Sequence, residues 1–195
     1  MKITVVGAQC TGKTTFINDI IDAFPQFVRE EYTYRDAIKD AGIENNINRK
    51  TNQESQRIIF NALAECAKRA KPYTILDRCV MDAVAYTIWP EQYSDEETDI
   101  TPQMIRNMHN TAVEVMDEYD LIIFIPADEN ISLEDDKFRD IDPEFRRQMT
   151  KIFEELLILE IEDPNFDKYG YKVVTISGTR EERIADFTEF IKAVN

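Results

Sequence analysis

Residues 7–14 read Gly7-Ala8-Gln9-Cys10-Thr11-Gly12-Lys13-Thr14, which fits the pattern G-x-x-x-x-G-K-S/T of a phosphate-binding loop, or P-loop. Its two glycines let the backbone wrap an anion, so that successive N–H groups and a helix N-terminus face the negative charge. In this pattern the lysine reaches the β- and γ-phosphates, and the threonine hydroxyl can ligate Mg²⁺. We therefore expect this stretch and the next residue, Thr15, to hold ATP, with Lys13 also catalytic and Thr14 also on the metal.

The residues on both sides of the loop fit its usual context, a buried strand before it and a helix after it. Residues 3–6 form a short β-branched run, as a buried parallel strand should. After Lys13, apolar residues recur at helical spacing: Phe16, Ile17, Ile20, Ile21 and Phe24. The chain has only 5 glycines and two of them fall in this loop, so a chance turn explains the pattern poorly.

The composition is that of an ordinary globular protein. At 195 residues, with 43% hydrophobic and 31% charged residues, the chain has the length for one α/β domain over residues 1–195. No apolar run approaches the roughly 20 residues of a membrane span. Because the N-terminus leads directly into a strand, we expect no signal peptide. The three cysteines have no metal-type spacing, and their odd number argues against a disulfide framework. We expect a cytoplasmic protein with free thiols and no membrane association.

The net charge is -15, from 38 acidic and 23 basic residues. This balance disfavours tight nonspecific contact with DNA, RNA or anionic lipid. A small basic pocket remains compatible with it, so the position of each cation is informative.

Charged side chains follow the second expected strand, residues 27–28. Ligands of open α/β sheets bind at the carboxyl ends of the strands. Glu30 and Glu31 lie at such an end and are candidates to hold a substrate hydroxyl, and Arg35 follows on the next helix as a further substrate contact. The alternative is that all three are ordinary solvated charges near a turn.

The strand at residues 73–76 delivers Asp77 and Arg78 at its carboxyl end. Beside a P-loop, Asp77 can hold Mg²⁺ through water or accept the proton of an attacking hydroxyl. Arg78 is suited to fixing a phosphate or the charge of the transition state. Asp82 lies one helical turn beyond Arg78, so it is either a substrate ligand or the partner of Arg78 in a structural ion pair. We expect the following helix to end at Pro90.

The most apolar run of the chain, residues 121–125, predicts a central parallel strand. Residues 128–142 follow it, rich in charge and poor in core residues, and Arg139 forms a local cluster of cations with Arg146 and Arg147. A mobile lid over residues 128–142, carrying a catalytic Arg139 over the transferring phosphate, explains this composition. The alternative is a solvated helix start.

The last expected strand, residues 173–176, is followed by Gly178. A glycine at this point indicates backbone close to a ligand, such as the base of a nucleotide, or simply a tight turn into a helix. Parallel strands that alternate with helices predict one α/β domain of three layers.

With these residues in view, the chain resembles the P-loop small-molecule kinases, nearest the ribosylnicotinamide-kinase-like and AAA-type kinase-like group of bacteria and phages. Four blocks carry the resemblance: the P-loop, Glu30-Glu31, the run D-R-C-V-M-D-A-V-A-Y at residues 77–86, and D-K-F-R-D-I-D at residues 136–142. The resemblance implies a five-stranded parallel sheet of order 2-3-1-4-5, ATP and Mg²⁺ as donor and cofactor, a nucleoside-like acceptor, and an adenine-side loop at residues 177–179. We expect no adenylyltransferase domain in this chain, unlike in the bifunctional enzymes of NAD biosynthesis.

Three classes of function compete. The first is a kinase that moves the γ-phosphoryl group of ATP to a hydroxyl of a nucleoside, nucleotide or ribosylnicotinamide-like small molecule. The second is a kinase acting on DNA or RNA, for example on a hydroxymethylated pyrimidine in DNA, which would need a basic groove. The third is an NTPase that is not a kinase; a GTPase switch would carry N-K-x-D after a strand, but the chain reads Pro126-Ala127-Asp128 there. The acceptor and the oligomeric state stay open.

Overall fold

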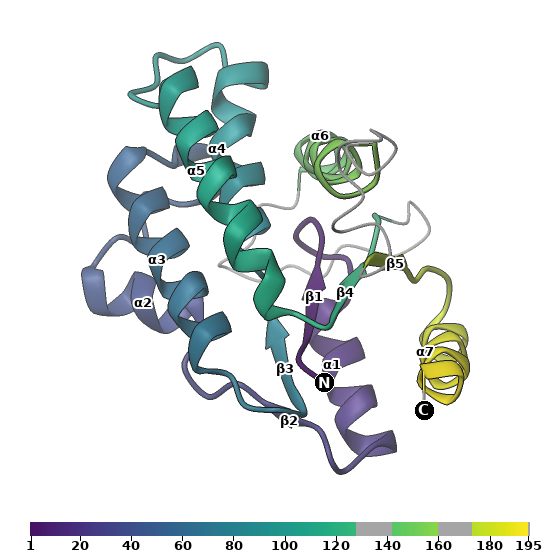
Figure 1. Cartoon of the computed structure of the whole chain (residues 1–195). Helices are drawn as coiled ribbons and strands as arrows, with labels where there is room; N and C mark the ends of the chain where they lie inside the picture. The colour runs from purple at the N-terminus through teal and green to yellow at the C-terminus, as the bar shows by residue number, and fades with distance from the viewer. Residues whose placement is uncertain (128–141, 160–172, 195) are drawn as a thin grey trace.

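The computed structural model describes residues 1–127, 142–159 and 173–194. One or two helices follow each strand along the described chain (Figure 1). In order they are β1 (Ile3–Val6), α1 (Lys13–Ala23), β2 (Val28–Arg29), α2 (Tyr34–Ala41), α3 (Gln53–Arg69), β3 (Thr74–Asp77), α4 (Val80–Tyr93), α5 (Pro102–Val115), β4 (Leu121–Phe124), α6 (Pro143–Glu154), β5 (Val173–Thr175) and α7 (Arg180–Val194). Short helical turns lie at Asn48–Lys50 and Met116–Glu118, and a π-helical turn, Glu155–Leu159, continues α6.

All strand pairs of the sheet are parallel, and the strand order is β2-β3-β1-β4-β5. This confirms the α/β fold and the strand order predicted from the resemblance. Ile3 of β1 is in register with Ile75 of β3 on one side and with Leu121 of β4 on the other. The strand that leads into the P-loop is therefore the central one, and its carboxyl end lies where ligands of such sheets bind.

Two layers of helices cover the sheet. Successive side chains of a strand point to opposite faces, so a strand buried on both faces is apolar throughout. In β1, Ile3 and Val5 pack in a cluster with Phe16 of α1 and Phe187 of α7. Val6 belongs to the larger cluster on the other face, which is built from α3, α4, α5 and α6. The expected three layers are present.

The prediction that the helix carrying Asp82 ends at Pro90 is wrong, because α4 runs on to Tyr93. Proline removes one backbone donor from a helix, which a well-packed neighbourhood can offset. Here the Trp89 ring packs edge-on against the Phe145 ring, with 4.8 Å between the ring centres. The indole N–H of Trp89 donates to the side-chain oxygen of Gln148 at 2.8 Å. These contacts between α4 and α6 stabilise the helical turn that contains Pro90.

The carboxyl ends of β1, β2 and β3 lie at one edge of the sheet, which follows from their parallel pairing. The P-loop, Arg29 and Asp77 are thereby brought to the same place. No helix within the described ranges is long and apolar enough to cross a membrane.

Candidate functional site

The P-loop needs glycine at both of its fixed positions. Gly7 has a φ of 137° and Gly12 a φ of 82°, which are conformations that L-residues rarely adopt. A Cβ atom on Gly7 would also overlap the carbonyl oxygen of Ile125, so the end of β4 packs directly against the turn. The result is a backbone cradle of the kind that holds phosphate at a helix N-terminus, here the start of α1.

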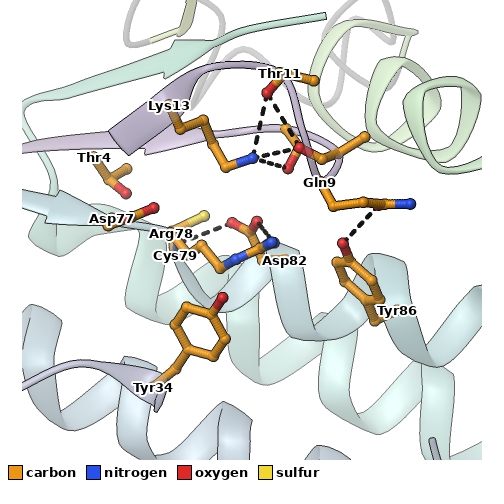
Figure 2. A network of polar contacts seen from close by, with 12 residues as sticks. Thr4, Gln9, Thr11, Lys13, Tyr34, Asp77, Arg78, Cys79, Asp82 and Tyr86 are labelled. Carbon is orange, nitrogen blue, oxygen red and sulfur yellow. Dashed lines mark hydrogen bonds and ion pairs between the residues drawn. The ribbon is translucent and has the colours of Figure 1, made fainter. Parts of the chain in front are cut away.

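Lys13 is buried against this loop (Figure 2). Its ammonium group donates to the carbonyl of Gly7 at 2.9 Å, to the carbonyl of Ala8, and to the hydroxyl of Thr11 at 3.3 Å. The side chain therefore has two roles: it carries a positive charge on the loop, and it satisfies carbonyl groups that the loop turns inward.

Thr14 and Asp77 meet at the cleft although 63 positions separate them in the chain. The Thr14 hydroxyl donates to Oδ2 of Asp77 at 3.2 Å, and the guanidinium of Arg29 donates to the same oxygen at 2.8 Å. Mg²⁺ prefers oxygen ligands and is usually held by one or two protein groups together with substrate phosphates. Among the described residues no group of three or more acidic, histidine or cysteine side chains could hold a metal alone. The Thr14–Asp77 pair thus fits a nucleotide-bound Mg²⁺.

Arg78 and Asp82 form a buried ion pair of 2.7 Å, and the second Asp82 oxygen accepts the N–H of Cys79 at 2.9 Å. The Arg78 guanidinium also lies between two aromatic rings, 5.1 Å from the centre of Tyr34 and 5.2 Å from that of Tyr86 (Figure 2). Burial by itself lowers the pKa of Arg78, but these rings and Asp82 raise the pKa well above its usual value. Arg78 is therefore a fixed, permanent cation.

Arg78 also has a φ of 89°, which is rare for a residue with a side chain. Such backbone strain is typically found at functional sites, where the surrounding structure holds it. Here the N–H of Arg78 donates to the carbonyl of Val5 at 3.0 Å, which fixes the turn after β3 to the end of β1.

The P-loop forms one wall of a cavity of about 530 Å³, within the range of small-molecule sites. Its other walls come from the end of β3, from α2, α3 and α4, and from the loop after α2. Residues from the P-loop side, including Lys13 and Thr14, therefore face the same space as Tyr34, Leu63 and Tyr86.

The other residues singled out from the sequence lie in several places. Arg35 lines the cavity, as do Asp77, Arg78 and Asp82. Glu30 pairs with Arg69 at 2.7 Å, Glu31 is exposed, and neither lines the cavity. Gly178 does not line it either, although its φ of 89° requires glycine. Arg139 and residues 128–141 of the candidate lid lie outside the described residues. The last residue of the candidate lid, Asp142, is described and caps the N-terminus of α6.

Arg183 is a site residue that the sequence reasoning missed. Its guanidinium is almost fully buried, and it donates to the carbonyl of Thr11 at 2.7 Å and to that of Gly178 at 2.9 Å. A Cβ on Gly12 would lie 3.2 Å from the same group. Arg183 thus joins the outer side of the P-loop to the turn after β5. Only its closeness to Gly178 in the sequence could have pointed to it.

We expect Arg183→Met to weaken binding of an ATP analogue about tenfold and to lower the free energy of unfolding by about 2 kcal/mol, since hydrogen bonds from a charged donor are lost. Titration calorimetry and urea unfolding measure the two effects. Lys192→Met, at an exposed position of the same helix, is the matched control. Equal nucleotide affinity in both variants would show that Arg183 does not hold the loop.

Comparison with known proteins gives a consistent picture. The sequence matches the family model described as AAA domain over residues 2–183. Three solved structures share the fold. They are the NadR protein in complex with NR (18% identity, TM-score 0.66, 95% of this chain and 49% of that chain), thymidylate kinase from Candida albicans (18%, 0.68, 98% and 91%) and deoxyadenosine kinase from M. mycoides with bound dATP (14%, 0.69, 98% and 100%). The chain spans about half the length of that NadR chain. A search of curated proteins found no match.

Proposed function

The chain belongs to the AAA domain family and has the fold of P-loop nucleoside and nucleotide kinases, and on this premise we propose that it is an ATP- and Mg²⁺-dependent phosphotransferase. Its acceptor is a nucleoside-like small molecule, and its place of action is the cytoplasm, where ATP is available.

One observation carries the proposal: the P-loop is a wall of a cavity that extends well beyond the loop. An NTPase that only hydrolyses its nucleotide needs room for one ligand. Here α2, α3 and α4 add an apolar and aromatic end to the cavity, with Tyr34, Ile59 and Leu63 among its lining. A second substrate in this end would face the γ-phosphate, and holding two reactants in line is most of what catalysis of phosphoryl transfer requires.

The proposed roles follow from the contacts. The backbone of the P-loop and Lys13 bind the phosphates, and Thr14 with Asp77 holds the metal, which when bound offsets charge on the β- and γ-phosphates. Arg78, fixed by Asp82, stabilises the charge of the transferring group. The hydrogen bond from Thr14 supports a metal-associated Asp77; the proton-accepting role is the alternative.

The remaining assignments are part of the same proposal. Gly178 and its neighbours form the adenine side of the site, and Arg35 and Asp82 contact the acceptor. Glu30 would reach an acceptor only in a complex that alters its pairing with Arg69, and Glu31 is proposed as a further acceptor contact. Arg139 would act from a lid over residues 128–142.

The experiment is a transfer assay with γ-labelled ATP and Mg²⁺. The acceptors are nucleosides, nucleotides, ribosylnicotinamide, and plain and hydroxymethylated DNA. Label on a small molecule supports the proposal. Label on DNA alone favours the nucleic-acid kinase, and release of free phosphate alone, whatever is added, favours an NTPase that is not a kinase.

A further inference from the structure

The acceptor end of the cavity, formed by α2 and α3, carries two cations. Arg35 and Lys39 lie one turn apart on α2, and both line the cavity. The Arg35 side chain donates to the hydroxyl of Tyr34 at 3.2 Å and lies over its ring. Within residues 1–127, 142–159 and 173–194, neither cation forms an ion pair with a carboxylate.

The other charges that line the cavity are arranged differently. Arg78 is paired with Asp82, and Asp77 receives the guanidinium of Arg29. Lys13 is bound to the P-loop. Among the described lining residues, Glu44 is the remaining acid. Asp77 also interacts electrostatically with Arg35, and Asp36 with Lys39, in a chain whose net charge is -15. Cations concentrated in a cleft of an acidic protein attract an anionic ligand and disfavour a cationic one.

The acids beside the P-loop are already engaged by donors. Both oxygens of Asp82 accept hydrogen bonds, from Arg78 at 2.7 Å and from the Cys79 N–H at 2.9 Å. Oδ2 of Asp77 accepts two, from Thr14 and Arg29. The single histidine, His109, does not line the cavity. A neutral hydroxyl must lose a proton as it attacks, whereas an ionised phosphate oxygen need not. This arrangement suits an acceptor that brings its own anionic oxygen.

The rest of the lining suits a nucleobase. Ile38, Ile59 and Leu63 are apolar, and Gln56 lies among them with a buried Oε1 that has no hydrogen-bond partner within the described part of the chain. A buried acceptor without a partner is unusual in a folded protein. Its amide nitrogen is engaged, because it donates to the hydroxyl oxygen of Thr51.

Neighbouring contacts fix the orientation of that amide. The Ser55 hydroxyl donates to the carbonyl of Asn52 at 3.0 Å, so the contact between Ser55 and Thr51 uses the hydrogen of Thr51. The Thr51 oxygen is then left to accept from Gln56. The Gln56 oxygen is thereby turned away from Thr51 and remains an acceptor without a partner among the described residues.

We propose that the acceptor is a nucleoside monophosphate and that an oxygen of its phosphate is the nucleophile. The inference rests on the proposed function. That oxygen forms a bond to the γ-phosphorus of ATP, and the bond from this phosphorus to the β,γ-bridging oxygen breaks, with its electron pair leaving on ADP. No proton moves, and the products are ADP and a nucleoside diphosphate. Arg35 and Lys39 hold the acceptor phosphate.

The experiment compares matched acceptors on the full chain with labelled ATP and Mg²⁺. Each common nucleoside is tested against its 5′-monophosphate, and ribosylnicotinamide, whose ring carries a positive charge, is tested beside them. We expect kcat/KM for one monophosphate or more to exceed that of the parent nucleoside by at least about 100-fold, with label in the diphosphate. The rate should fall as the pH drops through about 6, where the second ionisation of a phosphate monoester is lost.

Two variants test the cations. Arg35→Gln and Lys39→Gln should each raise KM for the monophosphate about tenfold or more and leave KM for ATP unchanged, a separation that mere loss of stability would not produce. Lys68→Gln, an exposed lysine of α3 outside the cavity, is the control and should behave as the unaltered protein.

Transfer to nucleosides or to ribosylnicotinamide, with the monophosphates inert, would overturn the inference and leave the proposed function standing. Transfer to no acceptor at all would overturn both. Unaltered KM for the monophosphate in both α2 variants would remove Arg35 and Lys39 from acceptor binding and with them the inference.

Discussion

Replacing Lys13 by alanine is expected to lower phosphoryl transfer by roughly 10²–10³-fold, which is the usual cost of removing one preorganised group that stabilises transition-state charge. The buried ammonium is held on the loop by the carbonyls of Gly7 and Ala8, so its charge lies where the P-loop pattern places a triphosphate. Steady-state kinetics with labelled ATP measures the loss.

The alanine change also leaves the loop carbonyls without their donor, so it can weaken the fold as well as the chemistry. Lys13→Gln separates the two effects, because an amide N–H can still donate to a carbonyl but carries no charge. We expect the glutamine variant to unfold close to the temperature of the unaltered protein and yet to lose turnover as severely as the alanine variant. Normal turnover in either variant would remove Lys13 from the ATP site.

The parts of the site that could be predicted from the sequence are mainly those formed by one continuous stretch of residues. The P-loop is one continuous stretch, and the conformations of Gly7 and Gly12 follow from its own pattern. The meeting of Thr14 and Asp77 was also within reach, because parallel neighbouring strands bring their carboxyl ends to one edge. The residues at that edge therefore predict from the sequence alone that Thr14 and Asp77 lie together beside the P-loop.

The parts that escaped prediction depend on the direction of single side chains. Successive residues of a strand point to opposite faces. Arg29 faces Asp77, and Glu30, the next residue, pairs with Arg69 instead. The sequence pattern predicted a substrate contact at Glu30 and no site residue at Arg29. Arg183 donates hydrogen bonds to backbone carbonyls. Every residue has a backbone carbonyl, so the sequence does not indicate which ones an arginine will contact.

Asp77→Asn is expected to lower kcat by roughly 10²–10⁴-fold, and the accompanying change in nucleotide affinity identifies the role of this residue. An amide keeps the shape of the carboxylate and removes its charge. The Thr14 hydroxyl and the Arg29 guanidinium then lose the anion that joins them on Oδ2.

If Asp77 belongs to the metal site, Mg²⁺-dependent affinity for ATP should fall together with the rate, and raised Mg²⁺ should restore part of the activity. If Asp77 is a general base, the rate should fall while ATP binds as before at every Mg²⁺ concentration. We expect the first pattern, because a phosphate acceptor needs no base and because the Thr14 hydroxyl lies 3.2 Å from the carboxylate. Asp120→Asn, an exposed acid at the opposite end of the sheet, is the control and should leave both quantities unchanged. Full activity of Asp77→Asn at low Mg²⁺ would exclude both roles.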